Sequence, residues 1–65
     1  MHVVVNGAQL DVKTAITIRE LADQLGLEGP IAVEVNKALV TRSRHTEYAL
    51  DDGDKVEIVQ FVGGG

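Results

Sequence analysis

Only one stretch of this chain has the spacing of an amphipathic helix, and short strand-like segments flank it on both sides. Thr17 begins a capping box that Glu20 completes three residues later. Gly26 stands where a helix usually ends, because glycine adopts positive φ without strain. One apolar stripe lies between these signals, and it consists of Ile18, Leu21, Ala22 and Leu25. A single helix over about residues 18–25 can cover only one face of a sheet, which predicts an α+β domain.

The strand-like segments predict a mixed sheet of about five strands. They are recognised by β-branched content or period-two alternation, and they cover residues 3–5, 9–13, 31–35, 38–40 and 55–61. Asn6-Gly7 is a strong hairpin signal because both residues tolerate positive φ, and Asn36-Lys37 is a plausible second turn. The order of two strands, one helix and three strands is that of a ubiquitin-like β-grasp fold. We expect its first and last strands to lie side by side and parallel.

The end of the sequence is its most informative feature. We expect a β-grasp domain over residues 1–62, followed by a flexible glycine tail, Gly63-Gly64-Gly65. Glycine has no Cβ, so such a tail can enter a narrow channel and deliver a carboxylate to a partner's active site. A frayed terminus explains the tail alone equally well. A chain of 65 residues leaves little material for a deep catalytic pocket, so we expect a protein that is not an enzyme.

Alternation along the last strand predicts a partner-docking patch beside the tail. If Val56 and Ile58 face the helix, then Val59 and Phe61 face the uncovered side of the sheet. We assign Val4, from the neighbouring first strand, and Val62 to the same patch. The alternatives are an exposed apolar face with no specific partner, or a β-bulge that turns Phe61 back into the core.

Composition excludes several classes of site. The chain has no cysteine, which excludes disulfides, thiolate metal sites and a cysteine nucleophile. We expect His2 and His45 on the surface without a third ligand, so no metal site and no catalytic residue is predicted. Six basic and ten acidic residues give a net charge of −4, which disfavours nucleic-acid binding. Arg42 and Arg44 form a small basic cluster with His45. No leader or membrane segment opens the sequence, so we expect a cytoplasmic protein with no membrane partner.

Several motifs together resemble the ThiS family of sulfur carriers, which serve thiamine thiazole biosynthesis. The resemblance covers essentially the whole chain. Its matching pieces are Val5-Asn6-Gly7, Thr17-Ile18-Arg19-Glu20-Leu21, Val33-Glu34-Val35-Asn36, the run from Leu50 to Val59, and Val62-Gly63-Gly64-Gly65. The last two of these pieces, one after the other, are fairly specific to the family. A terminal pair of glycines alone is shared with molybdopterin-synthase small subunits and ubiquitin-like modifiers.

The resemblance implies a role for each tail residue. Gly65 would be adenylated and then converted to a thiocarboxylate, and Gly63 and Gly64 would be its flexible approach. The implied partners are a ThiF-like adenylyltransferase, a cysteine desulfurase or other sulfur donor, and a thiazole synthase of the ThiG kind. These partners would use ATP and the sulfur source, so no cofactor is expected on the chain itself. We expect the free protein to be a monomer.

Three alternatives remain open at this point. The same sulfur chemistry could serve another acceptor, namely molybdopterin, a tRNA base or a cysteine precursor. The chain could also be a protein modifier that is joined to lysines through Gly65. The third alternative is a plain interaction module with an inert tail.

Overall fold

The computed structural model describes residues 1–61, and residues 62–65 lie outside the described residues. The predicted glycine tail and Val62 therefore fall outside this part of the chain. Five strands and one α-helix follow each other in the predicted order, and a short 3₁₀ helix that was not predicted lies between the last two strands. They are β1 (His2–Val5), β2 (Ala8–Asp11), α1 (Ile18–Gln24), β3 (Ile31–Val35), β4 (Ala38–Val40), η1 (Arg42–Arg44) and β5 (Lys55–Gln60).

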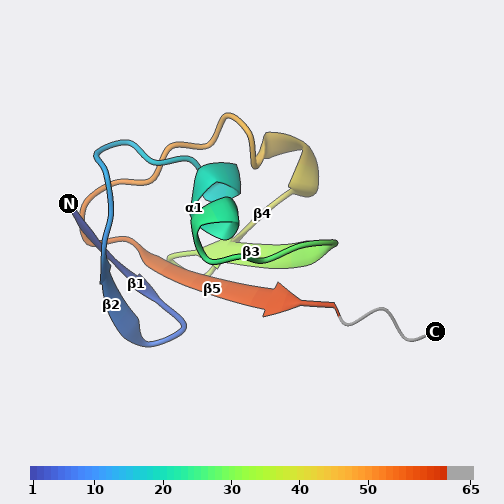
Figure 1. Cartoon of the computed structure of the whole chain (residues 1–65), viewed down its shortest axis with the longest axis horizontal. Coiled ribbons are helices and arrows are strands. Elements are labelled where there is room, and N and C mark those ends of the chain that lie inside the picture. Colours follow the sequence, from blue (N-terminus) through green and yellow to red (C-terminus); the bar gives the residue numbers. More distant parts are fainter. Residues whose placement is uncertain (62–65) are drawn as a thin grey trace.

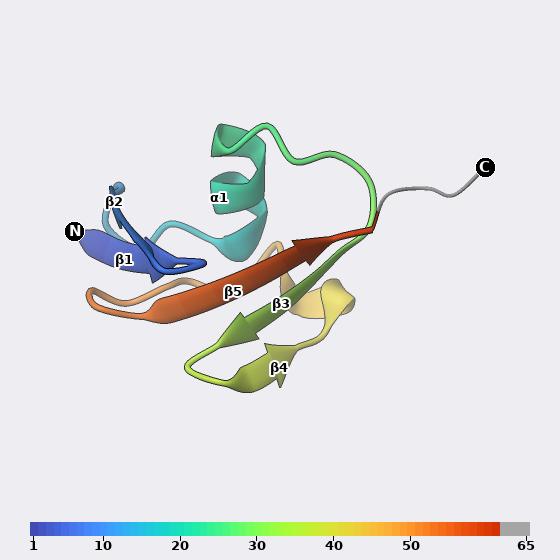
Figure 2. The same cartoon turned by 90° about the horizontal axis from the view of Figure 1, so that it is seen from below.

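The strands form one mixed sheet in the order β2-β1-β5-β3-β4. β5, the last strand, occupies its centre, where it pairs parallel with β1 and antiparallel with β3. The predicted parallel pairing of the first and last strands is confirmed. α1 packs across one face of this sheet, and no helix within residues 1–61 covers the other face (Figures 1 and 2). The α+β arrangement predicted from the sequence is therefore the observed one.

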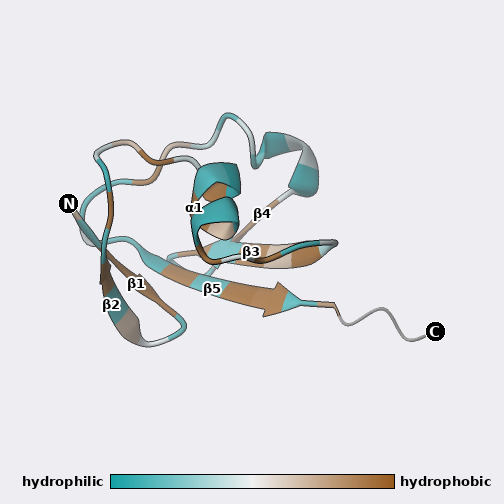
Figure 3. Cartoon of the chain, viewed as in Figure 1, coloured by the Kyte–Doolittle hydropathy of each residue, from teal (hydrophilic) through white to brown (hydrophobic). Residues whose placement is uncertain are grey.

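The core lies between α1 and the covered face of the sheet. Along α1 and β5, hydrophobic and hydrophilic bands alternate, as expected for elements with one buried side (Figure 3). The largest fully buried side chains come from the helix, the sheet and the loops beside them. They are Ile16, Ile18, Leu21, Leu50, Val3, Val33 and Val56.

One member of the predicted helical stripe is not in the core. Leu25 is 39% exposed, because α1 ends at Gln24 and Leu25 serves as its C-cap. Gly26 then takes a φ of +72°, and the chain reverses in a Schellman motif. In that motif the Leu27 N–H donates to the Ala22 carbonyl at 2.9 Å, and Leu27 packs against the core. Leu27, and not Leu25, is therefore the leucine of this turn that packs against the core.

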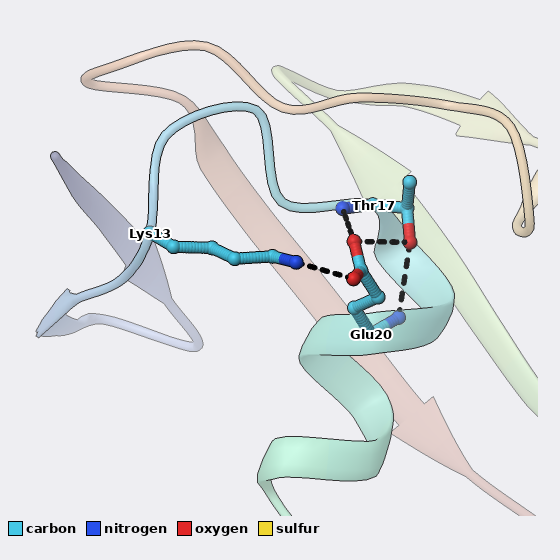
Figure 4. A network of polar contacts seen from close by, with 3 residues as sticks. All are labelled: Lys13, Thr17 and Glu20. Carbon is cyan, nitrogen blue, oxygen red and sulfur yellow. Dashed lines mark hydrogen bonds and ion pairs between the residues drawn. The ribbon is translucent and has the colours of Figure 1, made fainter.

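The start of α1 is fixed by the predicted capping box. The Thr17 hydroxyl accepts a hydrogen bond from the Glu20 N–H at 3.1 Å, and the Glu20 carboxylate accepts one from the Thr17 N–H at 3.0 Å. Lys13, from the loop before the helix, forms an ion pair with the same carboxylate (Figure 4). These contacts tie the preceding loop to the helix and satisfy two of its free N–H groups.

We predict that Glu20 titrates far below an ordinary glutamate. The ion pair with Lys13 and the hydrogen bond from the Thr17 N–H lower the pKa of Glu20 from 4.5 to about 2. Because the folded-state pKa lies below the unfolded value, this carboxylate stabilises the fold above about pH 4.5. The contribution is lost as the pH falls towards 2. An NMR titration of the Glu20 side chain would check this, and Lys13→Met should shift its midpoint upward. A midpoint near 4.5 in the unaltered chain would contradict the network.

Two asparagines hold β5 from its two sides. Asn6 and Asn36 each follow a strand and have positive φ values of 48° and 50°, as expected for the predicted turns. The Asn6 side chain accepts from the Ile58 N–H at 2.8 Å and donates to the Ile58 carbonyl at 3.1 Å. The Asn36 side chain accepts from the Lys55 N–H at 3.0 Å. Both side chains thus extend the hydrogen bonding of β5 beyond the ends of its neighbouring strands.

Candidate functional site

The strand that leads to the predicted tail is held firmly up to its last described residues. Gln60 pairs with Ile31 of β3, and its side-chain amide donates to the Glu28 carbonyl at 3.0 Å. The next residue, Phe61, donates its N–H to the Pro30 carbonyl at 3.1 Å. β5 is the central strand of the sheet, and its last residues point towards one end of the molecule (Figure 2). The predicted attachment residue Gly65 and its approach, Gly63 and Gly64, lie beyond this anchored strand and outside the described residues.

Part of the predicted docking patch lies on the uncovered face of the sheet. Val59 and Phe61 are 58% and 55% exposed. The alternative that Phe61 turns back into the core is therefore wrong. Val62 lies outside the described residues, and a docking role for any of these side chains stays a prediction.

Val4 does not lie beside Val59, as the prediction supposed. It is half-buried and pairs with Lys55 at the start of β5, four residues before Val59. At 3.3 Å per residue, this separates the two positions by about 13 Å. The neighbour of Val59 comes from β3, on the side of β5 away from β1. Ala32 of β3 lies directly opposite Val59. Leu39 of the edge strand β4 is 67% exposed.

His45 is not a surface histidine. It is only 6% exposed, and its Nε2 lies 3.1 Å from the Val40 carbonyl oxygen. Its own carbonyl accepts a hydrogen bond from the Arg19 N–H, which links the end of η1 to the start of α1. The turn of η1 directs His45 inward, so the predicted basic cluster loses this member. The Arg44 guanidinium instead lies over the Tyr48 ring, 5.4 Å from its centroid.

Sequence reasoning missed an apolar hollow on the helix side of the sheet. It encloses about 300 Å³ between the β1–β2 hairpin, the end of α1 and β5. Its lining is Val5, Asn6, Ala8, Leu10, Leu25, Leu27 and Ile58. The one polar side chain in this set, that of Asn6, is already bonded to β5. Leu25 was the available signal in the sequence for this hollow, but its helical spacing favoured a core position.

Carboxylates and histidines do not gather into a metal site in the described part of the chain. No group of three such side chains comes together within residues 1–61. The acidic turn before β5 uses its carboxylates locally. Asp54 accepts from the Asp51 N–H at 2.8 Å, and Asp52 accepts from the His2 N–H at 2.8 Å. Within the same residues, no helix is long and apolar enough to cross a membrane.

A sequence model of the ThiS family matches residues 3–65. The chain belongs to the ThiS family. The sulfur carrier protein ThiS of Bacillus subtilis is 46% identical to it over 50 residues, which cover 75% of this chain and 76% of that relative. The family resemblance inferred from the motifs is confirmed.

The fold agrees with that of a solved ThiS structure. The crystal structure of the thiamine biosynthesis protein ThiS from Geobacter metallireducens superposes with a TM-score of 0.80. The two sequences are 32% identical, and the match covers 100% of both chains. This confirms the ubiquitin-like β-grasp fold.

Longer relatives contain a ThiS-like segment within a larger protein. The chain is 39% identical over 66 residues to a thiazole synthase of Paramagnetospirillum magneticum. The match covers 100% of this chain but 20% of that relative, and a second thiazole synthase is covered to the same extent. This chain thus spans about a fifth of the length of these relatives.

Proposed function

We propose that this chain is a sulfur carrier of thiamine biosynthesis and that the carboxylate of Gly65 carries the sulfur. The observation that supports this most is the ThiS family match, which extends from residue 3 through the glycine motif to residue 65. The relative from Bacillus subtilis is itself named a sulfur carrier protein. The central strand β5, anchored through Phe61, provides a rigid base from which Gly63 and Gly64 reach a partner's active site.

The chemistry requires activation of a poor electrophile. A carboxylate oxygen of Gly65 attacks the α-phosphorus of ATP, which forms an acyl-adenylate and releases pyrophosphate. The terminal sulfur of a persulfide on the sulfur donor then attacks the acyl carbon, and AMP leaves. A thiol reductant cleaves the S–S bond of the resulting acyl disulfide, which leaves one sulfur on Gly65 and returns the donor as a thiol. The product is a thiocarboxylate, a soft nucleophile attached to a protein body. In this proposal a ThiF-like adenylyltransferase performs the activation and a cysteine desulfurase supplies the sulfur, so the chain is a cosubstrate and not an enzyme. We propose the cytoplasm as the place of the reaction, since the adenylyltransferase needs ATP.

The proposed acceptor of the sulfur is a thiazole synthase. Two relatives with that name each contain a segment similar to this entire chain. A carrier and its acceptor that occur in one polypeptide are held at high effective concentration. We therefore favour thiazole formation over molybdopterin, tRNA or cysteine precursors as the fate of the sulfur.

Intact-mass analysis tests the proposal directly. The purified chain is incubated with a ThiF-like adenylyltransferase, ATP, a cysteine desulfurase, cysteine and a thiol reductant. We expect the mass increase that corresponds to replacement of one oxygen by sulfur, located at Gly65 by fragmentation. Omission of ATP is the control and should prevent the change. An unchanged mass in the complete mixture, or a modification at another residue, would contradict the proposal.

A further inference from the structure

The loop that joins α1 to β3 contacts the end of β5. In Figure 2 this loop, drawn in green, meets the last residues of β5. The Glu28 carbonyl accepts a hydrogen bond from the Gln60 side-chain amide at 3.0 Å. Two residues later in the loop, the Pro30 carbonyl accepts one from the Phe61 N–H at 3.1 Å. The loop therefore holds both Gln60 and Phe61, the last two residues that the structure describes.

The acceptor end of the Gln60 hydrogen bond is itself fixed by the core. Leu27, directly before Glu28, packs against the core, and its N–H donates to the Ala22 carbonyl of α1 at 2.9 Å. At the donor end, side chains alternate along β5, so Gln60 lies on the helix side of the sheet together with the buried Ile58. The bond therefore joins the end of β5 to the helix side of the domain, independently of the backbone ladder.

The backbone ladder between β3 and β5 is incomplete at Phe61. In an antiparallel ladder, every second pair of opposite residues exchanges two hydrogen bonds. Pro30 and Phe61 are the next pair after the last one of the ladder. The Phe61 N–H donates to the Pro30 carbonyl, but no bond returns because proline has no N–H. This pair therefore supplies a single backbone bond, which makes the Gln60 side chain the second restraint on the end of β5.

The two restraints act close to the residue that reacts in the proposed function. Residues 62–65 follow Phe61, and a chain of that length spans at most about 14 Å when extended. If Phe61 is released from the loop, the tail begins one residue earlier and its origin moves by about 3 Å. Misplacement of reacting atoms by about 1 Å can slow a reaction about 100-fold. The reaction rate at Gly65 is therefore expected to depend on how well the end of β5 is held.

We propose that Gln60 is a positioning residue for sulfur loading, which joins the loop to the end of β5 and so fixes the point from which Gly65 reaches the adenylating centre. The inference rests on the proposed function, since it concerns the reaction of the Gly65 carboxylate. The contact needs an N–H on the side chain of residue 60, because its partner is a carbonyl oxygen. The side chain of Glu28 is not needed, because only its backbone takes part.

Three variants test this role. Gln60→Met removes the N–H and keeps a side chain of similar length, whereas Gln60→Lys restores a donor. Glu28→Met is the matched control, because it places the same side chain at the other partner and keeps the backbone carbonyl. NMR measures the hydrogen exchange of the Phe61 N–H. Intact-mass analysis with ATP, the sulfur source, a thiol reductant and saturating adenylyltransferase measures the rate of thiocarboxylate formation, and calorimetry gives the dissociation constant.

We expect Gln60→Met to speed the hydrogen exchange of the Phe61 N–H about 3- to 10-fold, as follows from the loss of one exposed hydrogen bond. Thiocarboxylate formation at saturation should slow by a similar factor. The dissociation constant should stay the same, because Gln60 does not lie on the uncovered face. Gln60→Lys should restore both rates, and Glu28→Met should leave both unchanged. A docking role for Gln60 would instead raise the dissociation constant and leave the saturated rate unchanged.

The outcomes separate the two proposals. If the unaltered chain gains sulfur but Gln60→Met reacts equally fast at saturation, the positioning inference is wrong and the proposed function stands. The inference is also wrong if Gln60→Met reacts slowly while the exchange of the Phe61 N–H is unchanged, or if Glu28→Met slows the reaction as much. If the unaltered chain gains no sulfur, the proposed function is wrong, and the inference falls with it.

Discussion

Replacement of Gly64 by tryptophan is expected to slow thiocarboxylate formation at Gly65 by about 100-fold or more. The reacting carboxyl group must reach the adenylating centre of another protein, and small misplacements of reacting atoms cost about that factor. An indole next to the attachment residue would widen the segment that must enter the partner's channel. Intact-mass analysis over time, with the adenylyltransferase, ATP and sulfur source present, measures the rate.

The matched control is Thr46→Trp, which adds the same side chain at an exposed position in the loop after η1. This variant should react at the rate of the unaltered chain. The dissociation constant of the Gly64→Trp variant for the adenylyltransferase should change by only a few-fold, because β5 and the uncovered sheet face are untouched. Full activity of the Gly64→Trp variant would mean that the tail does not enter a confined site.

Leu21→Ala is expected to lower the free energy of unfolding by about 2–5 kcal/mol. Leu21 is completely buried in the middle of α1, which supplies the cover of the sheet. A domain of this size has a total stability of about 3–10 kcal/mol, estimated from typical values per residue. The substitution therefore removes a large share of that stability. Urea denaturation followed by circular dichroism measures the change.

Leu39→Ala is the control for this experiment, since it removes the same atoms from a side chain that is 67% exposed. We expect a change within about 0.5 kcal/mol, as is usual for surface positions. If Leu21→Ala has as small an effect as Leu39→Ala, the packing of Leu21 between α1 and the sheet does not contribute to stability as expected.

Most of the fold followed from local signals that the tertiary structure did not overrule. The capping box at Thr17 and Glu20 fixed the first residue of the helix, and Asn6-Gly7 and Asn36-Lys37 form the expected turns. Each of these signals acts within a few residues, so its chemistry is visible in sequence. The parallel pairing of β1 with β5 was predicted at a coarser level, from the order of the elements.

The errors arose where an outcome depended on register or on a neighbouring element. Leu25 has correct helical spacing, but the helix ends before it and Leu27 packs against the core. His45 is buried because η1 turns it towards the Val40 carbonyl, and no short-range pattern announces a three-residue 3₁₀ helix. Val4 was assigned to the right face but the wrong end of β5, since alternation fixes the face of a side chain and leaves strand register open.

The same lack of register information hid which side chains lie opposite each other on the uncovered face. Glu34 and Glu57 come from strands far apart in sequence, and only the pairing of β3 with β5 sets them opposite each other. Residues 62–65 lie outside the described part of the chain, so the tail assignments remain sequence-based predictions.

The central position of β5 has a consequence for how such a carrier is made. The β1–β2 hairpin and the β3–β4 hairpin share no partner strand until residues 55–60 are synthesised and inserted between them. Glu57 and Val59 arrive with that final strand, opposite residues of β3 made much earlier. A protein that contacts β3 and β5 together on this face would therefore find its complete binding surface only after β5 has been inserted.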